Sequence, residues 1–107
     1  MNFEEGLEIV DETVLLNVGR RLSEVEISVL KGSWQKQTYD AIAHETHYSV
    51  NYLKIHVGPA LWKTLSTALD EPVTKITFDL FWSVGGEILE RQRVEIGKLR
   101  TLTVKRL

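Results

Sequence analysis

The stretch of the chain with the most chemical potential is residues 49–57, which read SVNYLKIHV. In a helix, Val50, Leu53 and Val57 would share one face and form a buried seam. The other side would carry a carboxamide, a phenol, an ammonium group and an imidazole, from Asn51, Tyr52, Lys54 and His56. Such groups can hydrogen-bond to DNA: Asn pairs with adenine through two bonds, and Lys contacts guanine or phosphate. The alternative is an ordinary solvated helix face, and the residues alone leave both interpretations open.

Further DNA contacts are predicted on either side of this helix. Ser49 stands where an N-cap is needed, so its hydroxyl can accept a hydrogen bond from an N–H one turn later. Lys36 and Thr38 are predicted to contact phosphate, and Lys63 to add non-specific affinity. The whole predicted contact set is Lys36, Thr38, Ser49, Asn51, Tyr52, Lys54, Ile55, His56 and Lys63.

No pattern in the sequence indicates catalysis. There is no nucleophile elbow, no Gly-rich phosphate loop before Lys-Ser/Thr, and no HExxH. His44 and His47 are three residues apart, but zinc would need a third strong ligand. The three tryptophans, Trp34, Trp62 and Trp82, could stack on bases, although their places within apolar stripes favour the core. We therefore expect no enzyme activity, no metal and no cofactor.

Length and composition describe one small globular domain. The chain has 107 residues, of which 43% are hydrophobic and 26% charged, as in ordinary globular proteins. No apolar run approaches the roughly 18–20 residues that span a bilayer, and the acidic start is unlike a signal peptide. The chain has no cysteine, so it has no disulfide framework. We expect a cytoplasmic protein with no membrane association.

The charge distribution bears on the choice of partner. A net charge of −2 argues against nucleic acid, because phosphate affinity comes from cations. However, the charge is polarised: residues 1–30 hold seven acids, whereas residues 98–107 hold four cations and no acid. DNA binding is thus permitted but not required. The competing hypothesis is an adaptor that binds a protein partner through the acidic first helix or the Tyr52–His56 face.

Two helices are predicted in the first third of the chain. The apolar spacing indicates an amphipathic helix over residues 2–18, which Gly19 ends in the left-handed conformation. Ser23 and Glu26 form an S-x-x-E capping box, so a second helix begins at Ser23. This second helix is expected to loosen at Gly32-Ser33.

A helix-turn-helix is predicted next. Thr38 caps a helix that runs to about Glu45, and His47 lies in the turn, where a left-handed residue is often required. Pro59 has no N–H and crowds the preceding turn. The second helix of the pair is therefore predicted to end or kink at Val57-Gly58, and another helix to begin at Pro59.

Residues 76–107 are interpreted as an extension to a helix-turn-helix domain that covers residues 1–75. Residues 76–84 follow the period of a strand, and Gly85-Gly86 is a turn signal. Residues 87–96 could therefore return as the second strand of a hairpin, or wing. The same apolar residues also fit helical spacing, which stays open. The basic end is expected to be an exposed strand or tail.

With these residues described, the chain resembles the N-terminal helix-turn-helix domain of cyanobacterial multidomain signalling proteins. Those proteins are associated with von Willebrand A, MoxR-type ATPase or NB-ARC/WD40 modules. The resemblance covers roughly residues 1–75. It is carried by MNFEEGLEIVDETV, GRRLSEVEISVLKGSWQKQTYDAIAHET and YSVNYLKIHVGPALWKTLSTAL. More distantly, Leu22–Leu65 looks like the four-helix DNA-binding domain of LuxR-type response regulators.

The resemblance implies a helix-turn-helix fold and a role in DNA binding or in regulating signalling. The chain departs from the family's pattern at His47, where Gly is usual, and around Ile55 and Ala60, where more basic residues are expected. Residues 76–107 do not obviously follow the family, and no ATPase or repeat module is attached.

These observations together predict a mainly α fold: an extra N-terminal helix, a tetrahelical helix-turn-helix core and a C-terminal hairpin or extension. The predicted function is transcriptional or signalling regulation through double-stranded DNA. A homodimer is expected, because one short helix contacts few bases. Either of two apolar stripes could supply its interface, one over Phe3–Val14 and one over Leu61–Leu69.

Overall fold

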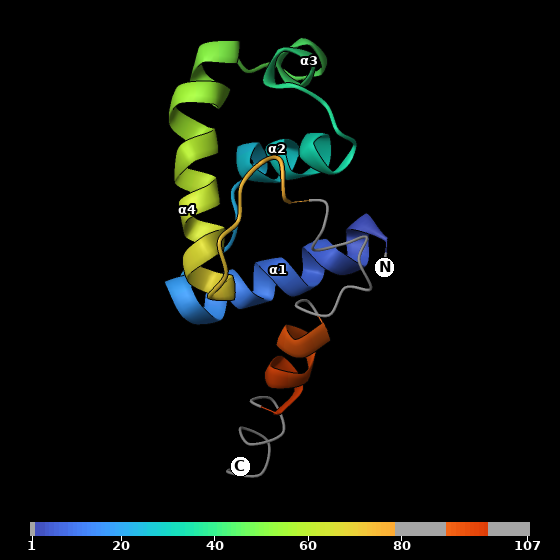
Figure 1. Ribbon diagram of the computed structural model, residues 1–107, viewed down its shortest axis with the longest axis vertical. Helices are drawn as coiled ribbons and strands as arrows, with labels where there is room; N and C mark the ends of the chain where they lie inside the picture. The colour runs from blue at the N-terminus through green and yellow to red at the C-terminus, as the bar shows by residue number, and fades with distance from the viewer. Residues whose placement is uncertain (1, 79–89, 99–107) are drawn as a thin grey trace.

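The computed structural model describes residues 2–78 and 90–98 (Figure 1). Within these ranges every regular element is helical: α1 (Phe3–Val18), α2 (Glu24–Trp34), α3 (Tyr39–Glu45), the π-helical segment η1 (Tyr52–Val57) and α4 (Gly58–Leu69). Residues 90–98 form a further helix, called here the 90–98 helix. The mainly α, helix-turn-helix architecture predicted from the sequence is confirmed.

The helices surround one core. In Figure 1, α4 stands upright, α1 crosses its lower end, and α2 and α3 lie above α1. The most deeply buried apolar side chains come from all five elements, among them Val14, Leu30, Ile42, Leu53, Leu61 and Leu65. The two stripes proposed for a dimer interface also face inward, since Val10 in α1 and Leu65 in α4 are fully buried. These stripes stabilise the monomer, so their assignment to a dimer interface was wrong.

The predicted caps of α1 and α2 are present. Gly19 ends α1 in the left-handed conformation, with φ of 88°. At the start of α2, the Ser23 N–H donates to Glu26 Oε1 at 2.8 Å, and the Glu26 N–H donates to Ser23 Oγ at 3.3 Å. Each of these bonds is made within a few residues of its partner, which is why the sequence alone was enough to predict them.

The end of α2 differs from the prediction. The helix does not loosen at Gly32-Ser33 but continues to Trp34. Gly32 lies directly against the Ile42 side chain, and a Cβ at this position would overlap it. The absence of a side chain therefore lets α3 approach α2 closely. Lys36 then closes the helix at φ of 61°. The Gln37 N–H reaches the Gly32 carbonyl at 2.9 Å, which completes a Schellman motif.

The predicted helix end at Val57-Gly58 is wrong, although the boundary between the π-helical η1 and α4 falls between these two residues. The chain is helical without interruption over residues 50–69, and both Val57 and Gly58 have right-handed helical dihedral angles. The Gly58 N–H bonds to the carbonyl of Leu53, five residues back. This wider π-helical turn carries the chain into α4 ahead of Pro59, which sits in the first turn of α4. The last two helices of the predicted tetrahelical core are therefore one helix.

The turn between α3 and this helix also corrects a prediction. Within the described ranges the non-glycine residues with positive φ are Lys36 and Asp70. His47 therefore makes the turn without the left-handed conformation that was expected of it. The turn adopted here therefore does not need the glycine that the family usually has at position 47.

A loop after α4 closes one side of the core. Ser66 Oγ accepts from the Val73 N–H at 2.9 Å and holds the loop against α4. Phe78 is then only 1% exposed, and its ring lies 5.6 Å from that of Trp62. The Lys75 ammonium group donates to the Gln37 carbonyl and lies 5.4 Å from the centre of the Tyr39 ring. Burial lowers the pKa of Lys75.

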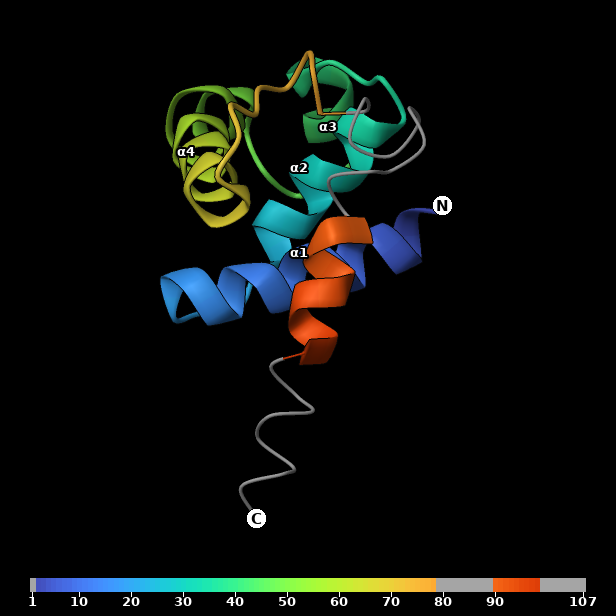
Figure 2. The same cartoon turned by 60° about the horizontal axis from the view of Figure 1, so that its bottom comes forward.

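The predicted hairpin does not form in the part that the structure describes. Residues 75–78 are a turn, and residues 90–98 are helical where the second strand was expected. The predicted turn at Gly85-Gly86 lies outside the described residues. The 90–98 helix lies beside α1 (Figure 2), and its Ile96 is buried and lines a pocket together with Glu8, Ile9 and Glu12 of α1. The helical spacing that the sequence left open concerns residues 76–88, of which residues 79–88 lie outside the described part of the chain.

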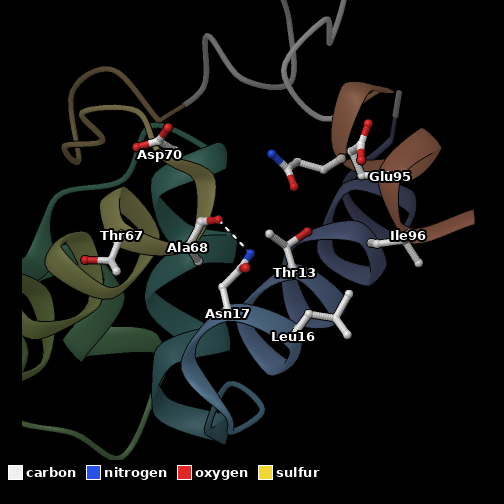
Figure 3. A pocket seen from close by; sticks show the side chains of 9 residues that line it. Thr13, Leu16, Asn17, Thr67, Ala68, Asp70, Glu95 and Ile96 are labelled. Carbon is white, nitrogen blue, oxygen red and sulfur yellow. Dashed lines mark hydrogen bonds between the residues drawn. The ribbon is translucent and has the colours of Figure 1, made fainter. Parts of the chain in front are cut away.

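A hollow of about 500 Å³ separates α1, the end of α4 and the 90–98 helix (Figure 3). At its floor, Asn17 Nδ2 donates to the Ala68 carbonyl at 3.0 Å. Ala68 lies in the last turn of α4, whose carbonyls have no partner within the helix. The Asn17 bond therefore ties α1 to α4 and satisfies one of these carbonyls.

Candidate nucleic-acid interface

The helix that begins after the turn has a fixed starting point. Ser49 Oγ accepts from the Tyr52 N–H at 3.1 Å, and the Ser49 carbonyl accepts from the Leu53 N–H at 3.1 Å. The predicted cap at Ser49 is thus confirmed. One helix earlier, Thr38 Oγ1 accepts from the Ala41 N–H at 3.2 Å, so α3 is also capped at the predicted residue. Both helices of the pair are held at their N-termini by local hydrogen bonds.

The buried and exposed sides of η1 are cleanly divided. Leu53 and Val57 are buried in the core, as predicted for the apolar seam of this helix. Asn51, Lys54 and Ile55 are exposed, and their positions place them on the side away from that seam. Ile55 is 59% exposed. We call Asn51, Lys54 and Ile55 the outer face.

Tyr52 and His56 lie on a different side from the outer face. The rings of Tyr48 and Tyr52 are 6.0 Å apart, and those of Tyr52 and His56 are 6.4 Å apart. The three rings form a row along the helix. Tyr52 and His56 also line a groove of about 340 Å³, together with residues at the start of α2 such as Val25. Of the predicted set, these two side chains are thus partly engaged by the domain itself.

Tyr48 is a residue that the sequence analysis missed. It is half-buried against the core and holds one end of the ring row, beside Tyr52. The four-residue spacing of Tyr48, Tyr52 and His56 is the signal that could have found it, because residues four apart share a helix face.

The remaining predicted contacts lie at three separate places. Lys36 is exposed beyond the end of α2, and Thr38 is exposed at the start of α3. Lys63 is exposed on α4, eight residues beyond Ile55, or about 12 Å along the axis at ordinary helical rise. The structure therefore groups Asn51, Lys54 and Ile55 on one side of a helix, whereas Lys36 and Lys63 belong to other elements.

The two arginines between α1 and α2 form ion pairs with carboxylates of the same domain. Arg20 makes two bonds to Glu26, at 2.8 and 3.0 Å. Arg21 lies 2.8 Å from Asp11 and 3.7 Å from Glu12. The positive charge of both guanidinium groups is therefore largely balanced inside the molecule.

Glu26 is the most buried acid of this network. Burial by itself would raise the pKa of the Glu26 carboxyl. The hydrogen bonds from Arg20 and Ser23 outweigh burial and hold that pKa below its ordinary value. Glu26 is consequently a charged structural group at neutral pH.

Across residues 2–78 and 90–98, no three His, Cys, Asp or Glu side chains are grouped so that they could hold a metal ion. No helix in the same ranges has the length and apolar character needed to cross a membrane.

A short capped helix, a tight turn and a second capped helix with a buried seam and an outer face define a helix-turn-helix domain. The chain belongs to the vWA-MoxR associated protein N-terminal HTH family, whose model matches residues 1–82. The family resemblance described above is thereby confirmed. Comparison with curated proteins and with solved structures gives no match, so the more distant likeness to LuxR-type domains stays a prediction.

Proposed function

We propose that this domain regulates transcription or signalling by binding double-stranded DNA, with the outer face in the major groove. The observation that carries the proposal is the placement of Asn51, Lys54 and Ile55 on a helix whose start is fixed by the Ser49 cap. An amide, an ammonium group and an aliphatic side chain match the donors, acceptors and methyl groups of base edges. We propose that the domain acts by binding rather than by catalysis.

Phosphate contacts would position the helix in the groove. Lys36 is exposed beyond the end of α2 and Lys63 is exposed on α4, and both can supply charge. The Thr38 hydroxyl accepts the Ala41 N–H but still has a proton to donate to a phosphate oxygen. Tyr52 and His56 have a smaller part in this proposal, because they face the groove beside α2.

We also propose that two copies bind one duplex. The outer face is about one helical turn long and contacts few base pairs, so a single copy has little selectivity. Because the two stripes first considered for an interface are buried, the contact between copies must use other surfaces. Stoichiometry measured with a labelled duplex tests this part separately from DNA binding itself.

The test of DNA binding is charge reversal at the outer face. Lys54→Glu should weaken binding to a pool of random duplexes by about tenfold or more, because it removes one contact and repels phosphate. Lys31→Glu, an exposed lysine on α2 outside the predicted set, is the matched control and should change affinity much less. Equal affinities of the two variants in fluorescence anisotropy would refute the assignment of the outer face.

A second candidate function is an adaptor that binds protein. It is favoured by the pairing of Arg20 and Arg21 with acids, which reduces the charge available for phosphate. For an adaptor that docks through α1, Glu4 and Glu5 are exposed acids in its first turn. Reversing both should abolish partner binding, whereas Lys54→Glu should leave it unchanged. The DNA proposal expects the opposite pattern.

A further inference from the structure

The most informative side chain of the outer face is its apolar one. Ile55 is 59% exposed and is not part of the core cluster. Tyr52, the other exposed apolar residue of η1, contacts the rings on either side of it. Ile55 thus offers an aliphatic surface with no partner ring, next to the ammonium-bearing Lys54.

The major groove has one apolar group, the C5-methyl of thymine. It is the group on DNA that an exposed isoleucine can cover with a gain from removing apolar area from water. Asn51 lies four residues before Ile55, and residues four apart share a helix face. Asn is the side chain whose amide pairs with adenine through both of its polar atoms. One helix face therefore presents partners for both bases of A·T pairs.

We propose that Ile55 contacts the C5-methyl of thymine, beside an adenine contacted by Asn51, and that the domain therefore prefers A·T pairs at the centre of its site. This inference rests on the proposed DNA binding. It adds the chemical class of the preferred site and the residue that confers the preference. A glutamate or lysine at position 55 would lack this preference, because a charged group gains nothing from a methyl group.

The test compares thymine with uracil, which differs only by the absence of the methyl group. Random duplexes are selected on the wild-type domain, and the enriched pool is then remade with deoxyuridine in place of thymidine. The wild type should bind the uracil pool about fourfold more weakly for each methyl group contacted. Ile55→Ala should bind the thymine pool about as weakly and show no further loss with uracil.

The control is Ile76→Ala. Ile76 is 89% exposed in the turn after α4, and its removal should leave the thymine-to-uracil ratio of the wild type intact. Equal binding of both pools by the wild type, or a ratio unchanged in Ile55→Ala, would overturn the inference while leaving DNA binding in place. Failure of the folded domain to bind either pool would overturn the inference and the proposed function together.

Discussion

At the scale of single residues, Lys36 combines a backbone strain with a proposed contact to phosphate. It occupies the left-handed region at φ of 61°, which costs a residue with a Cβ about 1 kcal/mol more than glycine. The Schellman motif at the end of α2 requires that conformation. Lysine is therefore not the residue best suited to the left-handed conformation at position 36. Its proposed contact with phosphate offers a reason for its presence.

Lys36→Gly should separate the two properties. We expect the free energy of unfolding to rise by about 0.5–1 kcal/mol, because glycine relieves the strain, while DNA affinity falls with the lost charge. Lys36→Ala is the control: it loses the same charge but keeps the strain. Chemical denaturation and anisotropy on both variants check this. A Gly variant less stable than the Ala variant would contradict the conformation assigned to residue 36.

Glu26 gives a prediction about pH. Its pKa is lowered in the folded state, so its charge stabilises the fold above its ordinary pKa, and this contribution is lost as the pH falls through the lowered value. Glu26→Gln should therefore cost about 1–2 kcal/mol at neutral pH, and the difference from wild type should shrink as the pH falls below the ordinary pKa of glutamate.

Denaturation curves over that pH range measure the difference between the two proteins directly. Glu24→Gln, which changes an exposed acid of the same helical turn outside the capping box, controls for general charge effects. A difference for Glu26→Gln that grows on acidification would contradict the lowered pKa.

At the scale of elements, the fusion of η1 with α4 is the feature that the sequence did not predict. Pro59 indicated a helix end because it lacks an N–H. That rule concerns the backbone hydrogen bond that residue 59 would donate, and not the bonds donated by the residues before it. The five-residue bond from Gly58 to Leu53 lies before Pro59, and Tyr39 packs so closely on Gly58 that a Cβ there would overlap its hydroxyl. This packing between α3 and α4 is invisible in local spacing.

Gly58→Ala tests that junction. The added Cβ would overlap Tyr39 Oη and lie 2.9 Å from the Leu53 carbonyl oxygen. We expect a loss of about 1–3 kcal/mol in unfolding free energy, although alanine is the better helix former. Gly97→Ala is the matched control, because a Cβ there meets nothing within 4 Å. It should be neutral or stabilising by up to about 1 kcal/mol. Equal effects of the two substitutions would refute the close contact.

At this scale, the features that could be predicted are those made by residues close together in the sequence. The caps at Ser23, Thr38 and Ser49 and the stop at Gly19 were predicted because each is made within a few residues. The alternation after residue 76 left strand and helix open, and residues 79–89 lie outside the part of the chain that the structure describes. Residues 90–98 are helical, and Ile96 is buried and lines a pocket together with residues of α1. Such long-range packing leaves no short pattern in the sequence.

At the scale of the whole molecule, the loop after α4 completes the core. Phe78 is 1% exposed and packs on Trp62, although it lies beyond the domain boundary predicted at residue 75. Phe78→Ala should lower the unfolding free energy by about 3–5 kcal/mol through the cavity it leaves. Ile76→Ala, at an 89% exposed position, should change it little. A small effect of Phe78→Ala in denaturant would support the boundary at residue 75.

The layout of charge decides how strongly such a domain can hold DNA. Arg20 and Arg21 are paired within the fold, so the charge for the proposed phosphate contacts comes from two exposed lysines, Lys36 and Lys63. The residues of the candidate site are those proposed from the sequence, and their separation into the outer face and the ring row could not be predicted. That separation depends on how η1 lies against α2.

The central claim is that the outer face binds DNA. The most direct test is fluorescence anisotropy of the wild-type domain with random duplexes, titrated with salt from about 50 mM upward. We predict measurable binding at low salt whose log–log slope against salt is about −2 for each bound copy, as two lysine–phosphate contacts would give. A folded domain that does not bind at the lowest salt, or whose binding is unaffected by salt, would contradict the account and favour the adaptor.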